Sequence, residues 1–253
     1  MSFDPEAIRE QFPILKRQVN GRPLVYLDNA ASSQKPRAVM DAMIRLMETS
    51  YSNVHRGLHT LANETTEAYE RARAAVARLI NAPSTNEIVF TKGGTEAVNL
   101  IASSFGRSLQ AGDEIVLSEM EHHANIVPWH FLRERQGVVL KFAPVTDDGR
   151  LDMDAYRALL GPKTRMVAIS HMSNVLGTIN PAREIIEAAH AMGVPVLLDG
   201  CQAIVHEQVD VQVLDVDSTS SPVTSSMAPP ASASSTARPN AWLPCHPIRA
   251  GAR

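Results

Sequence analysis

The alternation of short apolar runs with amphipathic stretches between residues 87 and 199 constrains the fold more than any other feature of this sequence. Strands are predicted over 87–91, 114–118, 139–142, 165–170 and 194–199, and helices over 94–105, 126–136, 152–160 and 182–192. Strands that alternate with helices of this length form a mainly parallel sheet with helices on both faces. The sequence therefore predicts an α/β fold.

The first 80 residues lead into this pattern. They predict a short helix over 4–12, a turn at Asn20-Gly21 and a strand at Leu24–Asp28, followed by helices over 36–47 and 63–80.

Length and composition exclude several classes of protein. The chain has 253 residues, of which 44% are hydrophobic, enough for one large domain with or without a tail. It has no run of eighteen apolar residues, and acids stand near its start, so we expect a cytoplasmic protein without a membrane span. A net charge of -3 gives no reason to expect nucleic acid. Two cysteines, Cys201 and Cys245, provide neither a disulfide framework nor a zinc motif, so no metal is expected.

The alternating pattern stops after Asp217. Residues 218–235 are a mixture of serine, proline and alanine, and residues 218–253 contain three arginines and no acids. Such a segment is typical of a disordered tail. We therefore divide the chain into a domain over 1–217 and a tail over 218–253, which is either disordered or read out of frame.

The apolar run from Val194 to Leu198 ends in a carboxylate, Asp199. A buried parallel strand would carry this acid to the carboxyl edge of the sheet, where α/β proteins bind their ligands. An acid at such a place can simply cap the strand, or it can pair with a protonated heterocyclic nitrogen.

Polar groups follow three other predicted strands and should meet Asp199 at the same edge. Gly94 and Thr95 open a helix, whose free N–H groups suit a phosphate, although the same residues often serve only as a cap. His122 can stack on a flat ring or face solvent, and Asn174 can cap a turn. A phosphate cradle, a stacking imidazole and a carboxylate for a ring nitrogen are together what a pyridoxal phosphate site requires besides its lysine.

Six stretches, in this order, resemble the cysteine desulfurases of the class V aminotransferase superfamily, specifically the sulfur-mobilisation group: YLDNAASSQKP, VHRGLHTL, FTKGGTEAVNL, EMEHHANIVPW, HMSNVLGTINP and LLDGCQA. The resemblance covers Asp4 to Asp217. It implies the large domain of a fold type I homodimer that binds pyridoxal 5′-phosphate. It also implies that sulfur is taken from L-cysteine, leaving alanine, and passed to an acceptor protein for iron–sulfur cluster assembly.

The resemblance also implies roles for individual residues. Gly94 and Thr95 would hold the phosphate, and His122 would stack on the ring. Asp199 would pair with the pyridine nitrogen, Gln202 would bond the phenolic oxygen, and Asn174 would lie near that oxygen and the substrate. Four further residues match segments at the substrate site or the mouth of the dimer's active site: Ala30, Ala31, His55 and Arg56.

After residue 217 the chain departs from the family pattern. The family continues with a segment like FYVFTGHKLYGPTGIGVLY, whose lysine forms the Schiff base, and later supplies a persulfide cysteine; neither residue is present here, and Cys201 belongs to the DGCQ turn. We therefore expect the C-terminal small domain to be missing and the chain to be inactive. If one base were missing after codon 217, the codons of residues 218–235 could encode FYVFTGHKLYGPTGIGVL in the neighbouring frame, which motivates a frameshift hypothesis.

Two alternatives stay open. The chain can be a noncatalytic binding or regulatory partner that keeps the dimer surface. It can also derive from another class V enzyme, such as a selenocysteine lyase or an aminotransferase.

Overall fold

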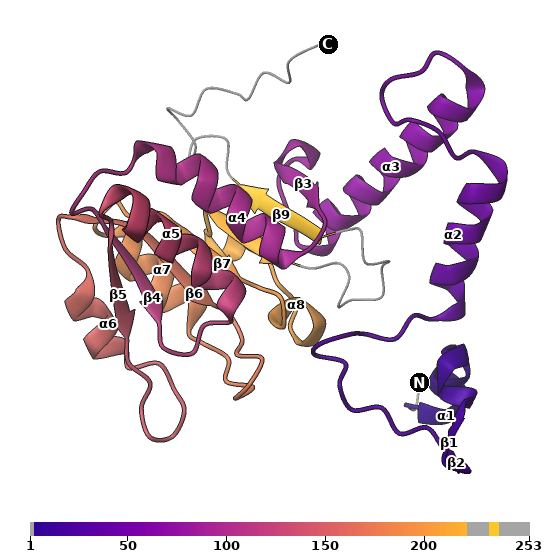
Figure 1. Ribbon diagram of the computed structural model, residues 1–253, viewed down its shortest axis with the longest axis horizontal. Coiled ribbons are helices and arrows are strands. Elements are labelled where there is room, and N and C mark those ends of the chain that lie inside the picture. Colours follow the sequence, from indigo (N-terminus) through magenta and orange to yellow (C-terminus); the bar gives the residue numbers. More distant parts are fainter. Residues whose placement is uncertain (1–2, 222–232, 238–253) are drawn as a thin grey trace.

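A seven-stranded sheet forms the centre of the molecule in the computed structural model, which describes residues 3–221 and 233–237 (Figure 1). The strand order is β3-β9-β8-β7-β6-β4-β5. The strands are β3 (Ile88–Thr91), β4 (Glu114–Ser118), β5 (Val139–Ala143), β6 (Thr164–Ser170), β7 (Val196–Asp199), β8 (Ser218–Ser221) and β9 (Ala233–Ala237). From β8 to β5 all neighbours pair in parallel, and β9 is antiparallel to both β8 and β3. The predicted α/β class with a mainly parallel sheet is confirmed.

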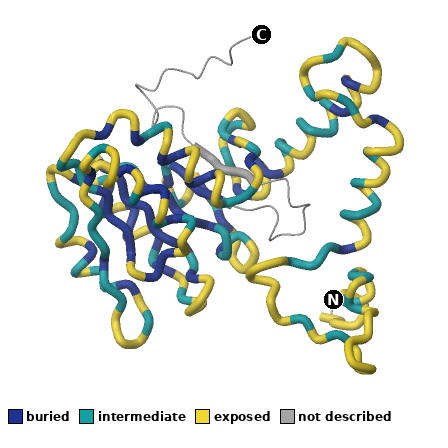
Figure 2. Tube along the Cα trace, in the orientation of Figure 1, coloured by how far each residue is buried: buried dark blue, intermediate teal, exposed yellow. Residues whose placement is uncertain are grey.

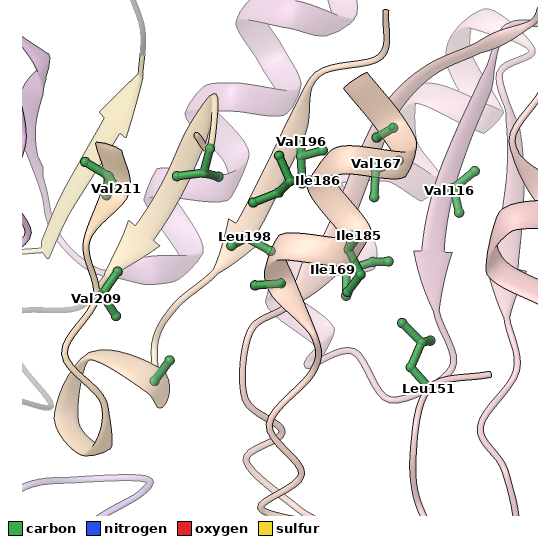
Figure 3. Packing of buried hydrophobic residues seen from close by; sticks show 14 of the residues in the cluster. Val116, Leu151, Val167, Ile169, Ile185, Ile186, Val196, Leu198, Val209 and Val211 are labelled. Atoms are coloured by element: carbon green, nitrogen blue, oxygen red, sulfur yellow. The ribbon is translucent and has the colours of Figure 1, made fainter. Parts of the chain in front are cut away.

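Helices cover both faces of the sheet. The longer helices are α2 (Arg37–Thr49), α3 (Thr60–Leu79), α4 (Gly94–Phe105), α5 (Val127–Gln136), α6 (Met153–Leu159) and α7 (Ala182–His190), and the short ones are α1 (Pro5–Glu10), α8 (Ala203–His206) and α9 (Val211–Leu214). Single-turn 3-10 helices are η1 (Pro13–Lys16), η2 (Thr85–Glu87), η3 (Gly106–Ser108) and η4 (His123–Asn125). On one face α4 and α5 form a core with Ile115 and Leu117 of β4. On the other face, the intervening Val116 belongs to a cluster that includes Ile185 and Ile186 of α7, as alternation along a strand requires (Figure 3). The same cluster extends to the end of α3.

The parallel strands are the most deeply buried part of the fold (Figure 2). Residues 196–199 of β7 are all buried, because β7 lies between β6 and β8 with helices on both faces. A strand buried on both faces reads as a continuous apolar run, which explains why the sequence marks this strand so clearly.

The N-terminal region extends away from the sheet (Figure 1). A small hairpin, β1 (Gln18–Val19) and β2 (Arg22–Pro23), turns at Asn20-Gly21, where both residues have positive φ as a type I′ turn requires. The strand predicted at Leu24–Asp28 is wrong, since β2 ends at Pro23. Val25 and Leu27 are 75% and 91% exposed, so the apolar alternation of this stretch finds no neighbouring strand in the described part of the chain.

The sheet continues beyond Asp217. Ser218–Ser221 forms β8 between β7 and β9, and residues 218–220 are buried. The expected loss of regular structure after residue 217 is therefore wrong for β8 and β9, because backbone hydrogen bonding in the middle of a sheet outweighs the low strand propensity of serine. The rest of the predicted tail lies outside the described residues. Across the described residues, no helix combines the length and apolarity needed to cross a membrane.

Candidate functional site

A cavity of about 770 Å³ opens where the parallel strands end. It is lined by residues from five separate segments: Asp28, Ala30, Ala31, Ser32, Ser33, Lys35, Gly94, Thr95, His122, Ala124, Ser170, Met172, Asn174, Asp199, Cys201 and Gln202. The structure thus brings together Ala30, Ala31 and all six residues assigned to the cofactor by resemblance. Small-molecule sites commonly have volumes of roughly 300–1,000 Å³.

The amino end of α4 forms one wall of the cavity. Helix α4 begins at Gly94, three residues after β3 ends at Thr91, and its N-cap Gly93 has no side chain to occupy the first N–H groups. Twelve residues of aligned peptide dipoles make this end favourable for an anion, and Thr95 adds a hydroxyl. This wall can therefore hold a phosphate group.

Asp199 is the last residue of β7 and is only 5% exposed. Its Oδ1 accepts hydrogen bonds from the backbone N–H of Cys201, at 3.1 Å, and from Oγ of Ser220, at 3.2 Å. Burial, and after it the nearby carboxylate of Asp199, raises the pKa of the Cys201 thiol well above its usual value. The thiol therefore stays protonated at neutral pH and is a poor nucleophile.

His122 caps η4 at the edge of the cavity. Its Nδ1 accepts the backbone N–H of Ala124 at 3.1 Å, so a neutral ring carries its proton on Nε2. The imidazole is exposed, and its position in the cavity wall is compatible with stacking on a flat ligand.

The residue before His122 is a buried carboxylate, Glu121. It accepts hydrogen bonds from the backbone N–H and Oγ of Ser170, at 2.9 and 2.7 Å, and from Nδ2 of Asn125 at 2.7 Å. Ser118 Oγ donates a further bond. Burial raises the pKa of Glu121, and the hydrogen bonds oppose that effect. This carboxylate ties the loop after β4 to the end of β6, which fixes two walls of the cavity relative to each other.

The segment 28–35 closes another side of the cavity. Nε2 of Gln202 donates to the carbonyl oxygen of Ala30 at 3.4 Å, which joins this segment to the turn after β7. Asn174 contributes from the loop that follows β6.

His55 and Arg56 do not line the cavity. They lie on the loop between α2 and α3 (Figure 1). His55 Nε2 is 3.0 Å from Oε1 of Glu70, which belongs to α3. The family resemblance places these two residues at the mouth of a dimer's active site. Because the structure contains a single chain, this placement stays a prediction.

The sequence analysis did not single out several residues that line the cavity. The most reactive of these is Lys35. Its Nζ donates to the carbonyl oxygen of Ser33 at 2.9 Å, and burial lowers its pKa. The only signal in the sequence was its place in the SSQKP stretch. Ser170 also escaped notice, because nothing in the sequence shows that Glu121 bonds to it.

Residues 25–226 match the family model for class V aminotransferases. The chain is 54% identical over 213 residues to a cysteine desulfurase of Dickeya dadantii (strain 3937), and 51% identical over 218 residues to one of Serratia proteamaculans (strain 568). These alignments cover 84% and 86% of this chain but 52% and 54% of the relatives, so the chain spans about half the length of the curated relatives it matches.

Solved structures give the same result. The S-sulfonic acid form of the cysteine desulfurase CsdA from Escherichia coli superimposes with a TM-score of 0.84 at 36% identity, covering 95% of this chain and 59% of that one. The apo cysteine desulfurase from Thermococcus onnurineus NA1 gives 0.88 at 32% identity, with 95% and 58% covered. The chain belongs to the class V aminotransferase family, and the relatives it matches are cysteine desulfurases.

Proposed function

We propose that the cavity binds pyridoxal 5′-phosphate and that the chain derives from a cysteine desulfurase. One observation supports this most: Thr95, His122 and Asp199, which lie at or just after the ends of three different strands, line a single cavity of suitable volume. Each type of group matches a different part of the cofactor. The donor set is therefore complementary to a phosphorylated pyridine rather than to a metal ion.

The proposed roles follow from the chemistry of each side chain. The free N–H groups of α4 and the hydroxyl of Thr95 would bind the phosphate, and His122 would stack on the ring. Asp199, as a buried carboxylate, would hold a proton on the ring nitrogen. When bound, pyridoxal phosphate supplies an electron sink for negative charge at the α carbon of an amino acid.

We propose L-cysteine as the substrate of the ancestral activity. The curated relatives are named cysteine desulfurases, and a structure described as SspA in complex with cysteine superimposes with a TM-score of 0.79 at 25% identity. Ala30, Ala31 and Asn174 lie where they could contact it. The corresponding partners would be a cytoplasmic sulfur-acceptor protein and the machinery of iron–sulfur cluster assembly.

We further propose that this chain does not turn over cysteine by itself. Residues 218–253 contain no lysine, and the position of the family's Schiff-base lysine in the restored frame is occupied by Ser225. A frameshift after codon 217 would explain this. Sequencing the gene tests it, since nucleotides that cannot encode GHKLYG in the neighbouring frame would exclude the frameshift.

A noncatalytic role through a second copy or a relative is a second candidate. It is favoured by apolar side chains exposed on the N-terminal region, where Leu27 is 91% exposed and Leu58 fully so. We propose that a second copy covers these side chains in a homodimer. Sedimentation of Leu58→Asp beside Val139→Asp, which alters the distant edge strand β5, should show a loss of dimer only for the first variant. A wild-type chain that sediments as a monomer at all concentrations would exclude the homodimer.

The function itself is tested with purified chain, pyridoxal phosphate and L-cysteine. We expect cofactor binding that Thr95→Ala weakens, with no formation of alanine. Alanine formation that requires Asp199 would show that the chain is active, and an absence of cofactor binding would contradict the proposal.

A further inference from the structure

The cavity contains a lysine that has no assigned role. The chain has five lysines: Lys16, Lys35, Lys92, Lys141 and Lys163. Of these, Lys35 alone is among the described residues that line the cavity. Lys92 precedes the phosphate-binding turn but does not line the cavity, and Lys141 is paired with Glu114 at 2.7 Å on β5. Lys35 is thus the lysine whose position brings it closest to a ligand of this site.

The orientation of a bound cofactor determines which wall meets its aldehyde. In pyridoxal phosphate the aldehyde carbon is para to the ring nitrogen and lies between the phenolic oxygen and the phosphate arm. A ring whose nitrogen faces Asp199, with its phosphate at Thr95, therefore directs its aldehyde away from the end of β7. Apart from the strand ends and the loops and helix starts that follow them, the cavity is lined by segment 28–35.

Segment 28–35 lies close to the turn that follows β7. Gln202, the proposed partner of the phenolic oxygen, donates its Nε2 hydrogen to the carbonyl oxygen of Ala30. The segment passes beside α8, which follows that turn directly (Figure 1). Lys35 lies five residues after Ala30 in the same segment and contributes its flexible four-carbon side chain to the same cavity.

The amine of Lys35 is suited to nucleophilic attack. Its side chain is half-buried, and burial lowers its pKa from the usual value of 10.5, which increases the fraction of neutral amine at a given pH. The carbonyl oxygen of Ser33 accepts a hydrogen bond from Nζ at 2.9 Å and holds the amine in the segment that borders the cavity. A neutral lysine amine in a partly desolvated site is the state that forms Schiff bases.

We propose that Lys35 binds pyridoxal phosphate covalently, as a Schiff base between Nζ and the cofactor aldehyde. This inference rests on the proposed function, because it requires the cofactor to occupy the cavity. The Nζ lone pair attacks the aldehyde carbon, and the resulting carbinolamine loses one water molecule that carries away the aldehyde oxygen and both amine hydrogens. No oxidant or reductant takes part. The proposal concerns attachment of the cofactor, not turnover of cysteine.

The test is reductive trapping followed by peptide mapping. The full chain is incubated with pyridoxal phosphate, reduced with borohydride, digested and analysed by mass spectrometry. We expect the reduced phosphopyridoxyl group on Lys35, with loss of this label and of the visible imine absorbance in Lys35→Arg. Lys92→Arg is the matched control and should keep both signals. Unfolding midpoints of the variants check that each one is folded.

Binding of pyridoxamine 5′-phosphate separates the failure of this proposal from that of the proposed function, because this analogue has no aldehyde. If it binds with a dependence on Thr95 while the label maps to another amine or to none, Lys35 is not the attachment site and the proposed function stands. If it does not bind at all, both proposals are wrong.

Discussion

A β-carbon placed on Gly94 would lie 2.7 Å from Sγ of Cys201, so the first residue of α4 packs directly against the turn after β7. This contact connects the turn that follows Asp199 with the amino end of α4, which offers N–H groups to a ligand. The spacing between the two proposed binding groups therefore depends on a glycine at position 94.

Gly94→Ala should lower the free energy of unfolding by about 1–3 kcal/mol, the usual cost of overpacking. In a Cys201→Ala background the sulfur is gone, so the same substitution should become neutral or stabilising by up to about 1 kcal/mol, since alanine favours a helix over glycine. Urea unfolding of the four chains measures this coupling. An equal cost in both backgrounds would show that Sγ does not set the limit.

Glu121→Gln should destabilise the chain by about 1–3 kcal/mol although it preserves the shape of the side chain. One carboxylate oxygen accepts the N–H of Ser170, and the other accepts Nδ2 of Asn125. Asn125 cannot flip, because its Oδ1 accepts Nε1 of Trp129 at 3.1 Å. In either orientation of the new side chain, its NH2 group therefore faces another hydrogen-bond donor, either the N–H of Ser170 or Nδ2 of Asn125. Glu134→Gln, at an exposed position on α5, is the control, and equal effects of the two substitutions would contradict this account.

His171 should make stability depend on pH. Burial lowers its pKa below the usual 6.5, an effect that the charge of Glu207 partly offsets. As the pH falls below about 6.5, the unfolded chain takes up a proton that the folded chain still refuses, so the stability contributed by neutral His171 is progressively lost until the pH passes its folded pKa.

The expected result is that the advantage in unfolding free energy of wild type over His171→Gln shrinks as the pH falls below about 6.5. Chemical unfolding across this range measures it, with His206→Gln at an exposed histidine as the control. If the advantage instead grows as the pH falls, the burial of the imidazole is wrongly assigned.

Ser218→Val should stabilise the chain by about 1 kcal/mol. Ser218 is only 4% exposed and pairs with Leu197, which faces the core formed by α4 and α5. A central strand buried on both faces ordinarily carries apolar side chains, and valine also favours strands. Thermal unfolding checks this beside Ser103→Val, at an exposed position on α4. A lower midpoint for Ser218→Val would show that no space for the added methyl groups exists.

The sequence predicted elements well wherever local pattern and tertiary burial agree, as in β4 and β7. It failed at Leu24–Asp28, because an alternating pattern cannot show whether a neighbouring strand exists. It failed in the opposite direction at β8, whose serines have low strand propensity but lie between two strands that supply hydrogen bonds. In both segments the structure depends on partners that are distant in sequence.

The residues of the cavity likewise divide into those that the sequence could place and those that it could not. Residues at strand ends, such as Thr95 and Asp199, could be placed from the sequence, because the carboxyl ends of parallel strands share one edge. Lys35 could not, since its place in the cavity depends on the path of segment 28–35, which Gln202 fixes through a contact 172 residues apart in sequence.

The most direct test of the account is the circular dichroism that achiral pyridoxamine 5′-phosphate acquires on binding, titrated with wild type and with Asp199→Ala. We predict a signal that saturates at one molecule per chain in wild type and is strongly reduced by Asp199→Ala, while Glu134→Gln behaves as wild type. No induced signal in wild type, or an equal one in Asp199→Ala, would contradict the claim that these loops form one cofactor site.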